Sequence, residues 1–210
     1  MSTVTASTKG PGAGGKRAAI LAAAADLIIE RGYDGTNLDA ICERAACSKS
    51  SIYVYFGNKE GLLAVLTEDI ALGLSQALHA FHLQHLSVED ALQRYARLSL
   101  KLILNERHIA IVRATISTVW KHPQLGPAYY EVGTLTAQSA LAQYFEVQSK
   151  IGVLDVPDPR WAAKEFQGML LWDRMLAQIV GARSSPGEAE IEAQADAAVA
   201  VFLGHYRAIR

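Results

Sequence analysis

The motif with the clearest chemistry lies at residues 47–59, CSKSSIYVYFGNK, where hydroxyl and basic side chains precede an apolar and aromatic run. Ser48 is a favoured helix N-cap, so Lys49, Ser50 and Ser51 fall in the first turn of a predicted helix. Free backbone N–H groups and the helix dipole attract phosphate at such an end. Small hydroxyl side chains allow close approach to a nucleic-acid backbone and can bond to base edges. The motif therefore indicates a helix tip that contacts DNA.

The same predicted helix has one side for a protein core and another for a partner. At about 100° per residue, Ile52 and Phe56 point toward a core, whereas Val54 points away from it. A valine with no core to fill can contact a thymine methyl group. Tyr53 lies on a flank from which its hydroxyl can reach a phosphate, while Tyr55 falls nearer the core side. For Tyr55, packing and DNA contact stay open as alternatives.

Three helices are predicted to position this tip. A first helix, with apolar residues at helical spacing, ends at Gly32. Thr36 and Asp39 form a capping pattern that opens a short second helix, and a tight break at Ala46 separates it from the third. Two short helices joined by a turn of about three or four residues form a helix-turn-helix, here at about residues 37–56. The second short helix of such a unit lies in the DNA major groove.

The rest of the chain is also predicted to be helical, with no convincing strand, so the expected fold class is all-α. Capping residues or prolines open the further helices at Asn58, Ser87, Asn105, Pro127 and Asp158, and a last helix precedes the C-terminus. We expect a flexible N-terminal tail at residues 1–15 and a helix-turn-helix domain at 16–74. The long helix from Asn58 joins it to a larger helical domain at 75–210.

The composition is that of a globular cytoplasmic protein. The chain has 210 residues, of which 50% are hydrophobic and 20% charged, with a net charge of −1. DNA binding must therefore come from a local surface rather than from overall basic charge. The two cysteines, Cys42 and Cys47, make no disulfide framework. The N-terminus does not read as a signal peptide, and neither a cofactor nor a membrane partner is expected.

The segment GYDGTNLDAICERAACSKSSIYVYFGNKEGLLAVL resembles the DNA-binding domain of the TetR/AcrR family of bacterial transcriptional regulators. The matching positions are Gly32-Tyr33, Thr36, Ile41-Cys42, Ala45 to Ser48, Ile52 to Phe56, Lys59-Glu60 and Leu62-Leu63. The resemblance covers roughly residues 16–74. The family turn usually carries glycine and then valine, where this chain has Ala46 and Cys47. A positive φ at Ala46 would cost on the order of 1 kcal/mol.

The resemblance implies a set of DNA contacts that overlaps the helical projection. The implied contacts are Thr36, Ser48, Lys49, Ser50, Ser51, Tyr53, Tyr55 and Lys59, to which the projection adds Val54. Residues 16–60 carry six Lys/Arg and six Asp/Glu, so binding should rest on placed contacts with a modest salt dependence. The resemblance further implies a ligand-responsive repressor that binds a double-stranded DNA operator as a homodimer.

The C-terminal half is similar in outline to the family's helical domain, which dimerises through its last two helices and encloses a small-molecule pocket. The helix from Pro159 also indicates a dimer on its own, because it carries two apolar rows. One row is Ala162, Phe166, Met169, Leu170 and Leu176, and the other is Trp161, Trp172, Met175 and Ile179. A helix that is apolar on two sides must bury both. A dimer would read half-sites about 34–36 Å apart in a palindromic operator.

Aromatic and adaptable side chains of this half are candidates for lining a pocket for an unknown small-molecule effector. They are Trp120, Tyr129, Tyr130, Phe166, Met169 and Trp172. His108 and Arg113 are polar groups within an apolar helix and could orient the ligand. Each of these residues could instead serve the core, the dimer contact or the surface.

Two rival functions have weaker support. His79, His82 and His85 lie three positions apart and could bind zinc or nickel, but no cysteine or carboxylate stands at ligand spacing. A helical enzyme would need an organised acid/base set, and the chain has no Gly-rich phosphate loop, no HExxH and no nucleophile motif. We therefore expect neither a metal site nor catalysis.

Overall fold

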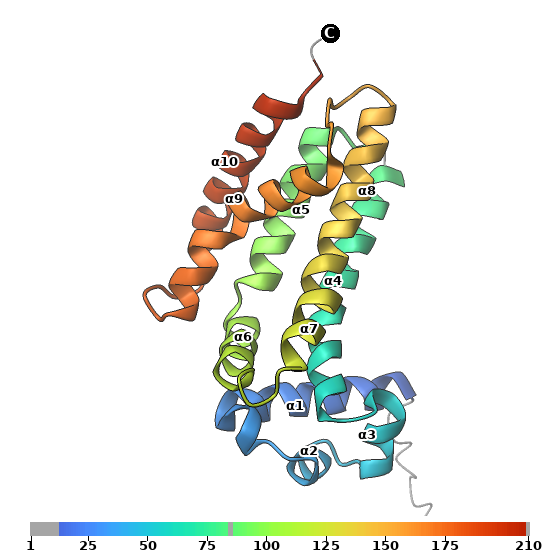
Figure 1. Ribbon diagram of the computed structural model, residues 1–210, viewed down its shortest axis with the longest axis vertical. Helices are drawn as coiled ribbons and strands as arrows, with labels where there is room; N and C mark the ends of the chain where they lie inside the picture. Colours follow the sequence, from blue (N-terminus) through green and yellow to red (C-terminus); the bar gives the residue numbers. More distant parts are fainter. Residues whose placement is uncertain (1–12, 84–85, 209–210) are drawn as a thin grey trace, which may run out of the picture.

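The protein is all-α, as predicted, with a small N-terminal unit and a larger helical one (Figure 1). The computed structural model describes residues 13–83 and 86–208. The N-terminal unit holds α1 (Ala13–Gly35), α2 (Leu38–Arg44) and α3 (Lys49–Phe56), and α4 (Lys59–Leu83) leads away from it. The larger unit adds α5 (Val88–Ile103), α6 (Glu106–Thr118), α7 (Leu125–Tyr129), the π-helix η1 (Tyr130–Leu135), α8 (Thr136–Lys150), α9 (Pro159–Ile179) and α10 (Glu188–Tyr206).

The N-terminal helices are held by one apolar core. Ile20 and Leu27 of α1, Ile41 of α2 and Ile52 of α3 are almost fully buried in it, together with Leu62 of α4. Burying such aliphatic side chains stabilises the unit by roughly 1.5–3 kcal/mol each. Because these residues come from every helix of the unit, the core fixes the angle at which α3 is presented.

Helix α4 belongs to both cores. Leu62 lies in the N-terminal core, whereas Leu74 and Leu78 lie in the larger core of the C-terminal unit. By length and composition alone, α4 would pass as a membrane span from Lys59 to Phe81. Its buried leucines identify it instead as a core helix that both units share.

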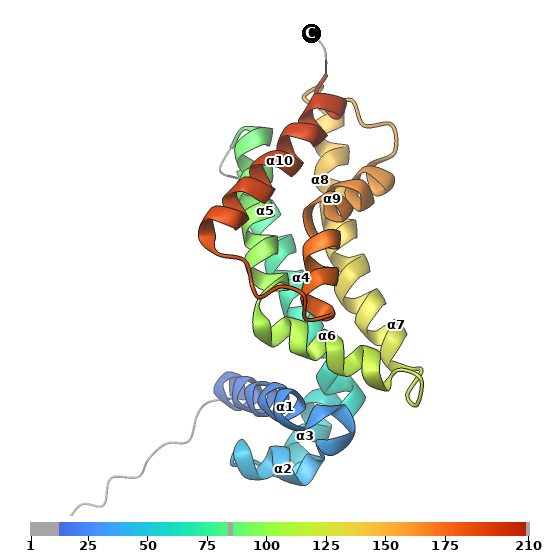
Figure 2. The same ribbon diagram turned by 90° about the vertical axis from the view of Figure 1, so that its left-hand side faces the viewer.

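The C-terminal core is centred on packed aromatic rings. Phe145 of α8 stacks on Phe202 of α10 with ring centroids 4.6 Å apart, and Phe166 of α9 meets Phe202 edge-on at 5.2 Å. Phe166 is fully buried in this cluster. Phe166 was a candidate for lining a ligand pocket, but in this structure its ring contacts other core rings. Figures 1 and 2 show α9 and α10 lying together on one flank of this unit.

Most predicted helix starts are confirmed, and one is wrong. Ser48, Ser87, Asn105 and Asp158 each accept a hydrogen bond from a backbone N–H in the first turn that follows. The N-cap of α2 is not Thr36 but its neighbour Asn37, whose Oδ1 accepts from the Ala40 N–H at 2.8 Å. The Thr36 hydroxyl instead donates to the Gly32 carbonyl at 2.9 Å. Gly32, with φ +71°, interrupts α1 where the helix was predicted to end.

Two other boundaries differ from the predictions. Of the predicted tail at residues 1–15, residues 1–12 lie outside the described part of the chain, whereas residues 13–15 belong to α1. The single helix predicted from Pro127 to Gln148 is a run of α7, η1 and α8. At Gly133 a Cβ would lie 3.3 Å from the Thr67 Cβ, so glycine lets η1 approach α4 closely. Such π-helical turns are frequent at functional sites.

Candidate nucleic-acid interface and effector cavity

The outer face of α3 presents small polar and apolar side chains. Ile52 is fully buried, whereas the side chains of Tyr53 and Val54 are 54% and 80% exposed. At the helix tip, the Ser48 hydroxyl lies 2.7 Å from the Ser50 hydroxyl and 3.0 Å from the Ser51 hydroxyl. The tip thus carries a group of exposed hydroxyls beside free N–H groups, with Val54 one turn further along the same face.

The turn into α3 has a positive φ at Ala46, the position where the family usually has glycine. Ala46 has φ +48°, a left-handed conformation usually taken by glycine, and the Cys47 N–H donates to the Cys42 carbonyl at 3.0 Å. Cys42 and Cys47 are both partly buried against the N-terminal core. The alanine therefore adds strain to this turn.

Lys49 and Tyr55 both have protein partners. The Lys49 ammonium forms an exposed ion pair with Asp39 of α2 at 2.7 Å, which raises the pKa of Lys49. A phosphate would have to compete with this carboxylate. Tyr55 packs partly buried against the N-terminal core, on the side where the projection placed it. Its hydroxyl is therefore less well placed for DNA than that of Tyr53.

Two of the implied DNA contacts are engaged inside the protein. Thr36 is 1% exposed and its hydroxyl is bonded to Gly32, so its side chain is closed to a ligand. The Lys59 ammonium donates to the Tyr33 carbonyl and lies 3.9 Å above the centre of the Tyr33 ring. Partial burial lowers the pKa of Lys59. Lys59 therefore ties the start of α4 to the end of α1 rather than standing free for phosphate.

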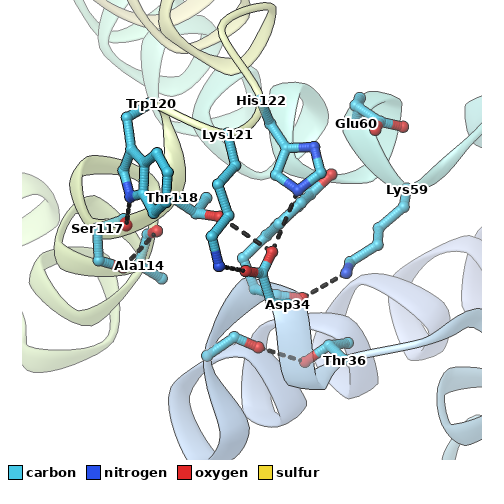
Figure 3. A network of polar contacts seen from close by, with 12 residues as sticks. Asp34, Thr36, Lys59, Glu60, Ala114, Ser117, Thr118, Trp120, Lys121 and His122 are labelled. Carbon is cyan, nitrogen blue, oxygen red and sulfur yellow. Dashed lines mark hydrogen bonds and ion pairs between the residues drawn. The ribbon is translucent and has the colours of Figure 1, made fainter.

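A polar junction joins the two units beside this lysine (Figure 3). The Asp34 carboxylate, at the end of α1, accepts from Thr118 Oγ1 at 3.0 Å and from Lys121 Nζ at 2.9 Å, and it lies 3.2 Å from His122 Nε2. These hydrogen bonds, with that of Lys121 first, lower the pKa of Asp34 to about 2. The sequence contained no signal for this junction, because the partners of Asp34 are more than eighty positions away.

Replacing Asp34 with Asn is expected to loosen the junction while both cores stay folded. An amide cannot replace a carboxylate that accepts from three groups, one of them the Lys121 cation. Amide hydrogen exchange should become faster at the end of α1 and at residues 118–122. Glu30→Gln is the matched control, because Glu30 pairs with Arg44 inside the N-terminal unit. Unchanged exchange at residues 118–122 in the Asp34 variant would show that the junction is not a restraint.

The C-terminal unit contains a largely apolar cavity of about 440 Å³ between α4, α6, α7, η1, α8 and α9. Inside it, Tyr129 Oη lies 3.2 Å from His108 Nε2. Burial lowers the pKa of the His108 imidazole to about 4 and raises the pKa of the Tyr129 hydroxyl to about 12. Both groups are therefore neutral near pH 7. A cavity of this size, with few polar groups, suits a small organic ligand.

The predicted pocket residues divide into two groups. His108, Tyr129, Tyr130 and Trp172 line the cavity. Phe166 lies in the aromatic core, and Met169 is exposed on another face of α9. Arg113 donates to the carbonyls of Gln178 and Ile179 at the end of α9, and Trp120 is 75% exposed with its indole N–H bonded to Ser117. These last four residues lie outside the lining of this cavity, because helical spacing does not show which face the tertiary contacts cover.

Polar residues that the sequence reasoning missed also line the cavity. Thr67, Gln138, Lys164 and Gln167 come from α4, α8 and α9. As for a metal, residues 13–83 and 86–208 contain no group of three or more His, Cys, Asp or Glu side chains able to hold one. Of the three histidines named as a rival site, His85 and the side chain of His82 lie outside the described residues.

The exposed α3 of a helix-turn-helix, carried on a larger helical unit with a cavity, is the architecture of a DNA-binding transcription regulator. The chain belongs to the TetR family of bacterial regulatory proteins, whose DNA-binding sequence profile matches residues 20–66. The profile of the C-terminal domain of AefR-like transcriptional repressors matches residues 90–208.

Solved structures and related sequences support the same family. A TetR-family regulator from Mesorhizobium loti is 30% identical with a TM-score of 0.78, and the match covers 94% of this chain and 100% of that one. The flavonoid-responsive regulator FrrA is also 30% identical, with a TM-score of 0.67 and coverage of 92% and 98%. RutR of Escherichia coli K12 is 38% identical over 88 residues, 41% of each chain. For YdeS of Bacillus subtilis the match spans 25% of that protein, so this chain matches well under half of either relative.

Proposed function

We propose that this protein is a cytoplasmic repressor that binds a palindromic DNA operator as a homodimer and releases it when a small-molecule effector enters the cavity. The observation that carries the DNA-binding part is the exposed face of α3. Its tip presents the hydroxyls of Ser48 and Ser50, and its outward side presents Tyr53 and Val54. Hydroxyls and N–H groups at the tip suit phosphates and base edges, and Val54 suits a thymine methyl.

The outer faces of α9 and α10 support a dimer. The exposed apolar residues of α9 are Trp161, Met169, Trp172, Leu176 and Val180. Met169 and Leu176 thus lie with the two tryptophans and not, as predicted, in the row of Phe166. On α10 the exposed residues Ala193, Ala197, Ala200, Val201 and Gly204 form one stripe at helical spacing. Small side chains on α10 allow a partner helix to approach closely, and this stripe beside the larger apolar stripe of α9 suits the same two helices of a second copy.

The cavity is linked to the DNA-binding unit through α4 and α6. Helix α6 contributes His108 to the cavity, and the adjacent Arg107 donates to the Ala22 carbonyl of α1 at 2.9 Å and pairs with Asp26 at 3.2 Å. The end of α6 meets Asp34 through Thr118. A ligand that shifts α4 or α6 would therefore change the angle of the N-terminal unit. The two reading helices would then no longer match the half-site spacing, which is a population shift between two dimer forms.

The relative FrrA is described as flavonoid-responsive. That description supports an aromatic effector here, since Tyr129, Tyr130 and Trp172 line the cavity of this chain.

Selection of bound duplexes from a random DNA pool tests the proposed function. The expected product is a palindrome whose half-sites are separated by about one helical turn, or a multiple of it, because a two-fold dimer presents two copies of α3. Recovery of no preferred sequence, or of a single unrepeated site, would contradict the proposal.

Val54→Lys is expected to change which base is preferred at one position of each half-site. The valine at this 80% exposed position would contact a thymine methyl, whereas lysine favours guanine acceptors. The change in preference should be about tenfold or more, measured by competition gel shift. The matched control is Ile29→Lys, which adds the same charge on α1, away from α3. If both variants keep the original preference, Val54 does not lie in the groove.

A further inference from the structure

The charged side chains that line the cavity favour a ligand with a negative charge over one with a positive charge. Lys164 of α9 lines the cavity, and among the described residues no aspartate or glutamate does. Within residues 13–83 and 86–208, Lys164 forms no ion pair with a carboxylate, and its ammonium lies 6.0 Å from the centre of the Trp161 ring. With His108 neutral, Lys164 is the one cationic side chain of the described lining. A cationic ligand would therefore find no counter-charge, whereas an anionic group would pair with Lys164.

Lys164 lies where the cavity meets the surface. An open cleft of about 1060 Å³ between α8 and the start of α9, lined by both polar and apolar residues, shares Gln138 and Lys164 with the cavity. Neither His108 nor Tyr129 lines this cleft. The cation and the buried His108–Tyr129 pair therefore occupy different parts of the cavity. A ligand that enters from the cleft would leave its charged end at Lys164, in contact with water, and bury its other end.

The buried pair can recognise a hydroxyl. His108 is 6% exposed, its Nδ1 is buried without a partner, and its Nε2 is close to Tyr129 Oη. In one tautomer Nε2 donates and the tyrosine hydroxyl is free to donate to a ligand; in the other, the tyrosine hydroxyl donates to Nε2 and can accept. A ligand hydroxyl suits either case, because it can act as donor and as acceptor.

The remaining lining suits a flat ring. Tyr130 and Trp172 line the cavity while their side chains are 50% and 69% exposed, so their rings border it near the surface. Aromatic rings of this kind stack against planar ligands. Aliphatic side chains of α4 and α9, including Leu74 and Leu171, supply the rest of the apolar wall.

Building on the proposed effector site, we propose that the cavity binds a planar aromatic acid that bears a phenolic hydroxyl. The carboxylate pairs with Lys164 at the cleft, the ring lies against Tyr130 and Trp172, and the hydroxyl bonds to the His108–Tyr129 pair. The effector would thus enter from the cleft with its hydroxyl end first and its carboxylate last.

Four matched probes test the assignment: 4-hydroxycinnamate, its methyl ester, 4-methoxycinnamate and the cation tyramine. Binding to the full-length protein is measured by calorimetry and by quenching of tryptophan fluorescence. The acid is expected to bind about ten to a hundred times more tightly than its ester, because a charge-assisted pair is lost in the ester. It should bind several times more tightly than the methyl ether, and tyramine should bind most weakly.

Two variants test whether Lys164 binds the carboxylate of the ligand and whether Tyr129 binds its hydroxyl. Lys164→Met should remove the preference for the acid over the ester, and Tyr129→Phe should remove the preference for the phenol over the ether. Lys150→Met is the control, because Lys150 lines the cleft but not the cavity and pairs with Glu146. Equal binding of acid and ester by the unaltered protein would overturn the assignment. So would tyramine binding as tightly as the acid, an acid preference that survives in Lys164→Met, or no binding of any probe at millimolar concentration.

The same preparation is assayed for binding to the duplex recovered from the random pool, so that the two proposals fail separately. DNA binding without discrimination among the probes would overturn the effector class and leave the repressor proposal standing. Discrimination among the probes without sequence-specific DNA binding would overturn the repressor proposal and support the assigned ligand chemistry of the cavity.

Discussion

The double variant Leu176→Arg, Ala197→Arg is expected to be a monomer that binds its operator about 10²–10⁴-fold more weakly than the unaltered protein. Leu176 lies in the exposed apolar stripe of α9 and Ala197 in the small-residue stripe of α10. An arginine on each would meet its symmetry mate across a two-fold axis, where like charges and extra volume oppose contact. In a monomer, a second DNA-binding unit is no longer held near the second half-site, so the gain in affinity from its high effective concentration is lost. Sedimentation equilibrium and gel shift measure the two effects.

The control for this variant is Glu192→Arg, which places arginine on α10 at an exposed position outside the stripe. It should leave the mass and the operator affinity of the dimer almost unchanged. A double variant that stays dimeric would move the interface away from α9 and α10. A monomer that keeps full operator affinity would show that two-fold binding contributes little.

Acidification is expected to destabilise the protein through His108. The folded pKa of this histidine is about 4, below its ordinary value of 6.5, because burial disfavours the charged ring. The unfolded chain therefore takes up the proton first, and the contribution of His108 is present above pH 6.5 and is lost as the pH falls toward 4. The loss in free energy of unfolding should reach about 2 kcal/mol at pH 5 and about 3 kcal/mol at pH 4.

Urea unfolding followed by circular dichroism measures this loss, at one protein concentration because dimerisation also affects stability. His108→Phe is the comparison, since it keeps a ring of similar size and cannot titrate. The variant should be less stable at pH 7.5, where it lacks the bond to Tyr129, yet it should lose less stability between pH 7.5 and 5. Parallel pH profiles for the two proteins would contradict the role of burial at His108.

The sequence predicted the local parts of the fold well, because they depend on neighbours along the chain. Ser48 and Asp158 cap helices through N–H groups two or three positions away. The helical period of α3 predicts which side of it is buried and which is exposed, so the burial of Ile52 and the exposure of Val54 were both expected. The one wrong cap, Thr36, lies next to the true one, Asn37, and only the structure shows that the Thr36 hydroxyl bonds to the Gly32 carbonyl instead.

The cavity was predicted only in part, because its wall depends on how separate helices meet. His108 and Trp172 do line the cavity, but Arg113 and Phe166 have partners that their own helices do not reveal. The sequence analysis assigned no role to Lys164. Its place beside a cavity without carboxylates became visible only once α8 and α9 were positioned.

By itself, then, the sequence determined the all-α class, the helix-turn-helix and the side of α3 that is open to a partner, because capping and helical period are short-range properties. Tertiary structure alone decided that Lys59 is engaged by Tyr33, that Asp34 joins the two units and that Lys164 stands at the mouth of a cavity. Each of these depends on contacts between residues far apart in the chain. Such contacts are set by how whole helices pack, and side-chain types and spacing do not encode that packing locally.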